Sequence, residues 1–131
     1  MHREACGGYA TSEANKAADR RYVDEVLNQG HLEVIDELRT DDLEGVRGRV
    51  RMFRAAFPDL HVTVDGQVAE GDWAVMRLTF RGTHKGEFMG VPPTGKSVEF
   101  ATIVMNRYVD GKSVENWGLH DFHGLLKHLN E

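Results

Sequence analysis

The sequence predicts a single α+β domain, in which helices near the N-terminus pack on a curved antiparallel sheet. The spacing of the apolar residues changes near residue 60, from a helical period before it to alternation after it. Asp110-Gly111 lies between two runs of strand-forming residues and predicts a two-residue hairpin turn. Helices followed by an antiparallel meander are typical of α+β domains.

Three helices are expected before the sheet. The first spans residues 12–27, with Ser12 as its N-cap, because its apolar residues recur at helical spacing. A second, shorter helix covers residues 31–38. The third covers residues 43–57 and ends before Pro58, which cannot continue a helix.

The rest of the chain is expected to form strands and one closing helix. Residues 60–68 and 74–80 alternate between apolar and polar side chains, which predicts two strands joined by a turn. A loop rich in glycine and proline, residues 82–96, leads into the hairpin around Asp110-Gly111. Residues 122–129 can form the short closing helix.

The hairpin turn also predicts which residues face each other across the two strands. The expected pairs are Val109–Lys112, Asn106–Glu115, Val104–Trp117, Thr102–Leu119 and Phe100–Asp121. The face that these pairs share carries Phe100, Thr102, Val104, Asn106, Tyr108, Glu115, Trp117, Leu119 and Asp121. An apolar wall with a few polar groups is typical of a small-molecule pocket.

The opposite face of the hairpin is also apolar. It carries Ala101, Ile103, Met105, Val114 and Gly118. An apolar sheet face is rarely left in water. The sequence therefore predicts a homodimer that forms through this sheet.

Composition and charge exclude several classes of function. The chain has 131 residues, 40% of them hydrophobic, and no internal repeat, which predicts one domain over residues 12–131 after a flexible leader, residues 1–11. The formal net charge is −5 and the basic residues are scattered, so no nucleic-acid partner is expected. No apolar run reaches membrane length and the N-terminus lacks a signal-like apolar segment, so we expect a cytoplasmic protein with no membrane partner.

A metal site is not expected either. His120 and His123 are three residues apart and His128 follows, but no cysteine or well-spaced acidic residue accompanies them. The predicted hairpin register also places His120 on the face opposite Asp121.

Three motifs together resemble the SnoaL-like polyketide cyclase (ester cyclase) family. They are Pro92-Pro93-Thr94-Gly95-Lys96, Asp110-Gly111-Lys112 and Glu115-x-Trp117-x-x-x-Asp121. The resemblance covers about the whole domain. It implies the nuclear-transport-factor-2-like cone, in which helices and a bent antiparallel sheet enclose a deep pocket. That fold also serves isomerases, dehydratases and proteins without known catalysis.

The chain departs from this family between the second and third helices. Family members usually carry a longer segment there, with a short strand and a histidine followed by prolines. Here residues 38–43 join the helices almost directly, so this strand and its histidine are expected to be absent. The pocket is then more open, or another chain completes it.

The resemblance implies a role for Asp121. The matching aspartate of the family is proposed to act as general acid and base in an intramolecular aldol condensation that needs no cofactor. His84, Asn106 or the Trp117 indole N–H can then stabilise the enolate oxygen. The residues expected to shape the pocket are Phe53, Phe80, Phe100, Val104, Asn106, Trp117 and Leu119. In the alternative interpretation, Asp121 only caps the closing helix.

Three functions stay open at this point. The leading one is a cofactor-independent cyclase that acts on a small, carbonyl-rich, apolar substrate through Asp121. The second is an isomerase or dehydratase on the same fold. The third is a non-catalytic module for ligand binding or assembly, which the shortened connection at residues 38–43 favours, so the sequence leaves it undecided whether the chain is an enzyme.

Overall fold

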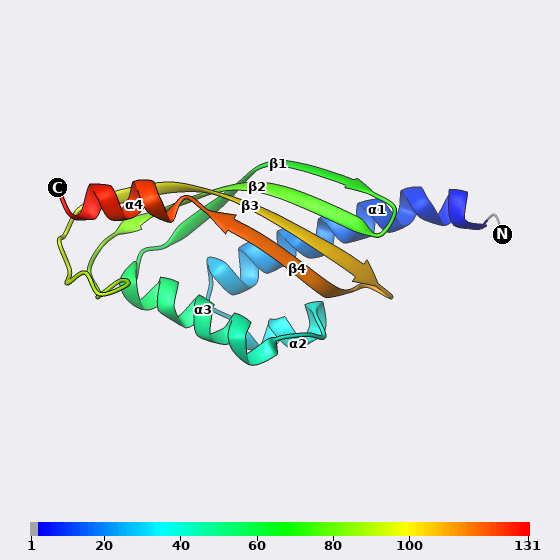
Figure 1. The fold of residues 1–131 in the computed structure, drawn as a ribbon. Coiled ribbons are helices and arrows are strands. Elements are labelled where there is room, and N and C mark those ends of the chain that lie inside the picture. The colour runs from blue at the N-terminus through cyan, green and yellow to red at the C-terminus, as the bar shows by residue number, and fades with distance from the viewer. Residues whose placement is uncertain (1–2) are drawn as a thin grey trace.

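The computed structural model describes residues 3–131, which form one antiparallel sheet with helices packed against one of its faces (Figure 1). The sheet has the strand order β1-β2-β3-β4. Its strands are β1 (His61–Glu70), β2 (Trp73–Thr83), β3 (Ser97–Val109) and β4 (Lys112–His120). The predicted α+β architecture is confirmed.

The helices occur where the apolar periodicity predicts them, with differences at the ends. They are α1 (Arg3–Arg21), a π-helical turn η1 (Tyr22–Leu27), a 3₁₀ turn η2 (Leu32–Val34), α2 (Ile35–Leu38), α3 (Leu43–Ala56) and α4 (Phe122–Leu129). α1 begins at Arg3 and not at the predicted cap Ser12, which lies inside the helix. The predicted flexible leader, residues 1–11, overlaps this helix, and Met1 and His2 lie outside the described residues.

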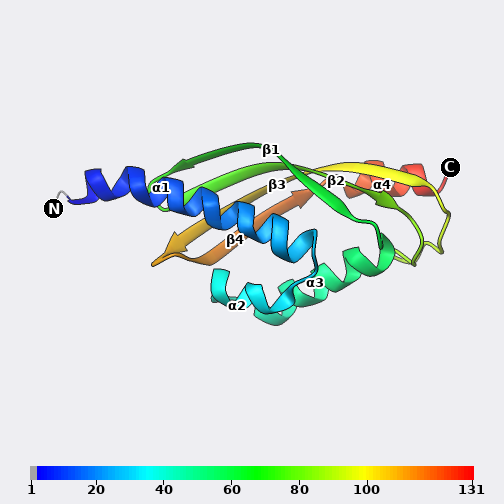
Figure 2. The ribbon, with the colours of Figure 1, turned by 180° about the vertical axis from the view of Figure 1, so that it is seen from behind.

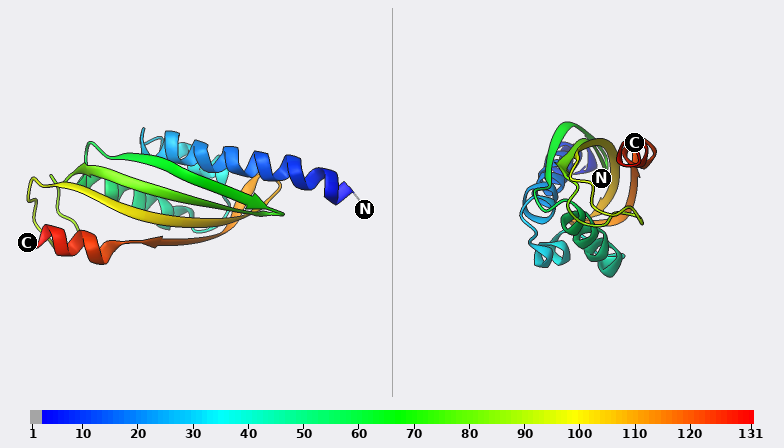
Figure 3. Two further views of the ribbon diagram at one scale, coloured as in Figure 1. Left: turned by 90° about the horizontal axis from the view of Figure 1, so that it is seen from above. Right: turned by 90° about the vertical axis from the view of Figure 1, so that its left-hand side faces the viewer.

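The views from behind and from above show how the two layers meet. α1 runs along the sheet beside β1, and α3 lies under the middle of the sheet (Figure 2). From above, no helix crosses the outer face of the sheet, and α4 lies beside the end of β4 (Figure 3). The helices therefore close one face of the sheet and leave the other uncovered.

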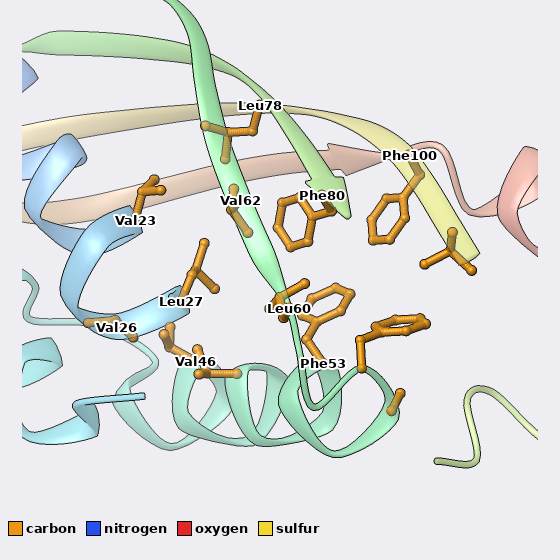
Figure 4. Packing of buried hydrophobic residues seen from close by; sticks show 14 of the residues in the cluster. Val23, Val26, Leu27, Val46, Phe53, Leu60, Val62, Leu78, Phe80 and Phe100 are labelled. Carbon is orange, nitrogen blue, oxygen red and sulfur yellow. The ribbon is translucent and has the colours of Figure 1, made fainter. Parts of the chain in front are cut away.

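Aromatic side chains fill the core between α3 and the strands (Figure 4). The ring of Phe53 on α3 lies 5.2 Å from that of Phe80 on β2, and Phe80 lies 4.9 Å from Phe100 on β3. All three are buried, as are Val46 and Val50 on the same face of α3. This packing holds α3 beneath β2 and β3 and fixes one end of the space between helices and sheet.

The predicted register of the β3–β4 hairpin is correct at its turn and wrong beyond it. Val109 pairs with Lys112 as expected. Further along, Tyr108 pairs with Ser113 and Arg107 with Glu115, which leaves Val114 without a partner as a β-bulge. The observed pairs that follow are Asn106–Asn116, Met105–Trp117, Val104–Gly118, Ile103–Leu119 and Thr102–His120. Beyond the bulge, each β4 side chain lies on the face opposite to the predicted one.

The connection between α2 and α3 is as short as the sequence predicts. Arg39 forms an isolated parallel bridge with Ser113, and Thr40 N donates to Ser113 O at 3.0 Å. The connection thus runs beside β4 through a single bridge. This contact places Arg39 against the space between the layers.

Candidate active site in the cavity under the sheet

A cavity of about 360 Å³ lies between the sheet and the helical layer. η1, the α2–α3 connection and α3 line one side, and β2, β3 and β4 line the other. Its polar lining residues are Tyr22, Arg39, Asp41, Asp42, Arg49, Asn106, Tyr108, Ser113, Asn116 and His120. Apolar walls with a few placed polar groups suit a small organic ligand.

His120 is the titratable residue that the β-bulge turns into the cavity. Its Nδ1 lies 2.7 Å from Thr102 Oγ1, and its ring stacks on Phe122 at 4.7 Å. Nε2 has no hydrogen-bond partner among the described residues. Burial lowers the imidazole pKa and the charge of Arg49 lowers it further, so the ring is neutral at pH 7. A neutral imidazole that is held in place by Nδ1 can accept a proton at Nε2.

A buried hydrogen-bond network connects the cavity to α1. Asn106 Nδ2 donates to Asp19 Oδ1 at 3.0 Å, and the Tyr108 hydroxyl donates to the same oxygen. Asp19 Oδ2 is buried without a partner among the described residues. Burial raises the pKa of Asp19 to about 6, although the hydrogen bonds from Tyr108 and Asn106 act in the opposite direction.

The network fixes the orientation of a second amide in the cavity. Asn106 Oδ1 accepts from Asn116 Nδ2 at 2.7 Å and from Ser113 Oγ at 3.0 Å. With Asp19 as the acceptor at the other end, the amide of Asn106 can have only one orientation. Asn116 keeps one N–H and its carbonyl oxygen for a ligand. It is the amide best placed to contact a substrate oxygen.

Four of the predicted pocket residues line the cavity, and a fifth lies close behind it. Phe53, Phe80, Val104 and Asn106 belong to the lining, as expected. Phe100 packs against Phe53 and Phe80 and is buried in the core next to the lining.

Trp117 and Leu119 do not face the cavity, so their predicted place on the inner face is wrong. They are 61% and 77% exposed on the outer face of the sheet. The Trp117 indole N–H donates to Glu115 Oε2 at 2.8 Å, outside the cavity. The physical reason is the bulge at Val114, which reverses the direction of the β4 side chains. Gly118, predicted on the outer face, lines the cavity instead.

The two predicted catalytic residues lie outside the cavity lining. Asp121 is exposed, and its carboxylate accepts from Gly124 N at 3.0 Å as the N-cap of α4. His84 is fully buried after β2, where Thr94 N donates to its Nδ1 at 3.2 Å. His84 thus holds the 84–96 loop in place. The capping interpretation of Asp121 is confirmed, and its catalytic role stays a prediction.

Several cavity residues were not among the predicted site residues: Tyr22, Arg39, Arg49, Asn116 and His120. One signal for the β4 residues was present in the sequence. Asn116, Gly118 and His120 alternate with Trp117 and Leu119, so the polar and small residues share one face. The predicted register had no bulge at Val114, and this placed the wrong β4 residues on the inner face.

Metal-binding clusters and membrane-spanning helices are both absent from the described part of the chain. Within residues 3–131, no group of three or more His, Cys, Asp or Glu side chains is arranged to hold a metal ion. No helix in that part of the chain is long and apolar enough to cross a membrane.

Curated relatives of this chain come from Streptomyces. The chain is 32% identical over 108 residues to the aklanonic acid methyl ester cyclase DauD of Streptomyces sp. (strain C5). The matched segment is 82% of this chain and 66% of DauD. The chain is also 30% identical over 124 residues to the aklanonic acid methyl ester cyclase DnrD of Streptomyces peucetius. This matched segment is 94% of this chain and 83% of DnrD.

A solved structure shows the fold, and a family model shows the family. AclR of Streptomyces galilaeus, described as a candidate hydroxylase, superposes with a TM-score of 0.81 at 32% identity, covering 88% of this chain and 80% of AclR. The predicted nuclear-transport-factor-2-like cone is thereby confirmed. The model of the SnoaL-like polyketide cyclase family matches residues 10–129. The chain therefore belongs to the SnoaL-like polyketide cyclase family.

Proposed function

We propose that this chain catalyses the intramolecular cyclisation of a small, carbonyl-rich compound by acid–base chemistry, without a cofactor. Membership of the cyclase family and the names of DauD and DnrD support the reaction class. The observation that carries the proposal is His120, a neutral imidazole fixed by Thr102 and directed into a cavity with hydrogen-bond donors.

His120 supplies the proton transfers that an aldol cyclisation needs. Nε2 removes a proton from a carbon between two carbonyl groups, and the electron pair of that C–H bond moves into an enolate. The N–H of Asn116 stabilises the enolate oxygen. The enolate carbon then forms a bond to the carbon of a further carbonyl group of the same molecule, whose C=O electron pair moves to its oxygen and gives an alkoxide. The new alkoxide takes the proton back from the imidazolium, so the substrate is isomerised and no other reactant is required.

Asp121 offers the same chemistry from a different position. In the resting structure its carboxylate caps α4, and it must leave Gly124 to reach a substrate in the cavity. His120 needs no such movement. The geometry therefore favours His120 as the acid–base group, and Asp121 is the residue to compare with it.

Two variants test this proposal. His120→Gln keeps a polar side chain beside Thr102 but removes the base, and Asp121→Asn keeps a good N-cap but removes the carboxylate. Both are assayed by chromatography and mass spectrometry with aklanonic acid methyl ester and the corresponding free acid. We expect His120→Gln to lose about 10²-fold or more in kcat, and Asp121→Asn to stay within a few-fold of the wild type.

The opposite result, with loss only in Asp121→Asn, would show that the resemblance identified the correct base and that the geometric assignment fails. A product with the same mass but without a new ring would favour the isomerase alternative. Ligand binding without any turnover in the wild type would favour the binding module.

A further inference from the structure

Arg39 is a buried cation on the wall of the cavity. Its side chain is only 7% exposed, on the short connection between α2 and α3. Nε donates to Asp41 O at 3.1 Å and Nη2 donates to Asp41 Oδ1 at 2.8 Å. A guanidinium has five N–H groups, so these two bonds leave three without a partner among the described residues.

Nη1 of Arg39 has no partner among the described residues but is not sealed off, so it can contact a ligand or water in the cavity. A planar guanidinium with free N–H groups matches the two oxygens of a carboxylate better than it matches a neutral carbonyl. The N–H groups of Arg39 without a partner among the described residues therefore suit an anionic acceptor within the cavity.

The neighbours of Arg39 reinforce the positive field. Arg49 and Tyr22 line the same cavity, and the Tyr22 hydroxyl has no hydrogen-bond partner among the described residues. Burial raises the pKa of Tyr22, whereas the charges of Arg39 and Arg49 act to lower it. Three cavity residues, Tyr22, Tyr108 and His120, have pKa values that arginine charges lower.

Two aspartates at the same site do not cancel this field. Asp41 pairs with Arg39, and Asp42 lies 3.3 Å from Arg49 Nη1. The side chains of Asp41, Asp42 and Arg49 are 46%, 54% and 49% exposed, so water screens all three charges, whereas the charge of Arg39 is buried. The negative charges lie at the rim and the buried charge is positive.

We propose that Arg39, with Arg49 and Tyr22, forms a subsite in the cavity for a carboxylate of the substrate. The inference rests on the proposed function for the identity of the cavity as the reaction site, and it names the substrate class as an aromatic or polyketone free acid. DauD and DnrD are named for a methyl ester, in which this charge is masked. The short α2–α3 connection is the feature of this chain that brings Arg39 to the lining.

The test compares two ligands of nearly the same shape that differ in charge. 2-Naphthoate carries a carboxylate and methyl 2-naphthoate does not, and both are small enough for a cavity of about 360 Å³. Binding at neutral pH is followed by titration calorimetry and by NMR. We expect the wild type to bind 2-naphthoate at least about tenfold more tightly than the ester.

The His120 signal gives a second readout. The charge of Arg49 lowers the His120 pKa, so a bound carboxylate that offsets this charge raises it again, and the neutral ester does not. An NMR titration of His120 with each ligand measures this difference.

Three substitutions test which arginine causes the preference for 2-naphthoate over the ester. Arg39→Met keeps most of the side-chain volume and should remove the preference for 2-naphthoate, and Arg49→Met should reduce it. Arg51→Met is the matched control, because Arg51 is exposed on α3 and does not belong to the cavity lining. If Arg39→Met fails to fold, the wild-type comparison and Arg49→Met still decide the question.

The inference is overturned if 2-naphthoate does not bind at millimolar concentration, if the ester binds as tightly, or if the preference survives Arg39→Met. These outcomes are separate from those of the proposed function. Cyclisation of the methyl ester without a preference for acids would leave the proposed function standing and refute the carboxylate subsite. Binding of 2-naphthoate with the expected preference, in a protein that cyclises nothing, would support the carboxylate subsite and refute the proposed function.

Discussion

Asp19 shows how one buried residue shapes the cavity without lining it. It lies on α1, fully buried, and accepts hydrogen bonds from Asn106 and from the Tyr108 hydroxyl. Its second oxygen has no partner among the described residues, so the ionised carboxylate is poorly solvated. Asp19 therefore orients the cavity amides at a cost in stability that depends on pH.

The sign of that cost follows from the pKa of Asp19, which is raised from 3.8 to about 6 in the folded protein. The folded state holds the proton more tightly than the unfolded chain does. The stability contributed by protonated Asp19 is therefore present below pH 3.8 and is lost as the pH rises to about 6.

Asp19→Asn is expected to remove this loss. The amide oxygen can still accept from Asn106 and Tyr108, and no charge is buried. Above about pH 6 the free energy of unfolding should exceed that of the wild type by up to about 3 kcal/mol, and the difference should shrink towards about pH 4. Urea unfolding at several pH values measures it. Asp24→Asn, at an exposed position, is the control, and an equal effect of both variants would show that Asp19 is not the source.

Among the elements, the 84–96 loop closes the apolar end of the helical layer. Lys85 N and Gly86 N both donate to Ala56 O at 3.0 Å, which ties the loop to the C-terminal end of α3. Phe88, in the same loop, is fully buried, with its ring 5.3 Å from that of Phe57. The loop therefore depends on a close approach between two backbone segments.

Gly86→Ala is expected to break this contact. A Cβ at residue 86 would lie 2.2 Å from Ala55 O, a backbone atom that cannot rotate away. We expect a loss of at least about 2 kcal/mol in the free energy of unfolding, measured by chemical denaturation. Gly48→Ala, at an exposed position of α3, is the control. A Cβ there meets no atom within 4 Å, so it should stabilise the helix by up to about 1 kcal/mol. Equal stability of the two variants would contradict the proposed tight contact.

The sequence predicts the elements well because their signals are local. Alternation identifies the inner face of β3, where Phe100, Thr102 and Asn106 are buried as expected. Asp110 and Gly111 both have positive φ, as the predicted hairpin turn requires. Helix periodicity likewise predicts α3, and the N-cap interpretation of Asp121 predicts the start of α4.

The site is predicted less well because one bulged residue decides the face of a whole strand. Val114 has no partner, and this moves His120 into the cavity and Trp117 out of it. Bulges leave little trace in a single sequence. Arg39 illustrates a second limit, since its place on the cavity wall depends on a bridge to Ser113, far away in the chain.

At the scale of the whole molecule, the corrected register enlarges the apolar outer face of the sheet. Val68, Val75, Met105 and Trp117 form one row across the four strands. Ile103 and Leu119 pair in the next row, and both are exposed. Because Trp117 and Leu119 belong to this face, it is larger than the sequence indicated, and no helix covers it (Figure 3).

The homodimer through the sheet is expected to bury this face. One apolar row spans the sheet, and in the next row Arg77 lies beside Ile103. An exposed apolar row of this length favours self-association, and a closed twofold dimer is the simplest arrangement. Size-exclusion chromatography with light scattering should show a dimer at micromolar concentration, and Ile103→Lys should shift it to a monomer by placing a charge in the interface. Met89→Lys is the matched control, because Met89 is an exposed apolar residue of the 84–96 loop and should leave the dimer intact. A monomeric wild type, or dissociation by both variants alike, would show that the outer face of the sheet is not the interface.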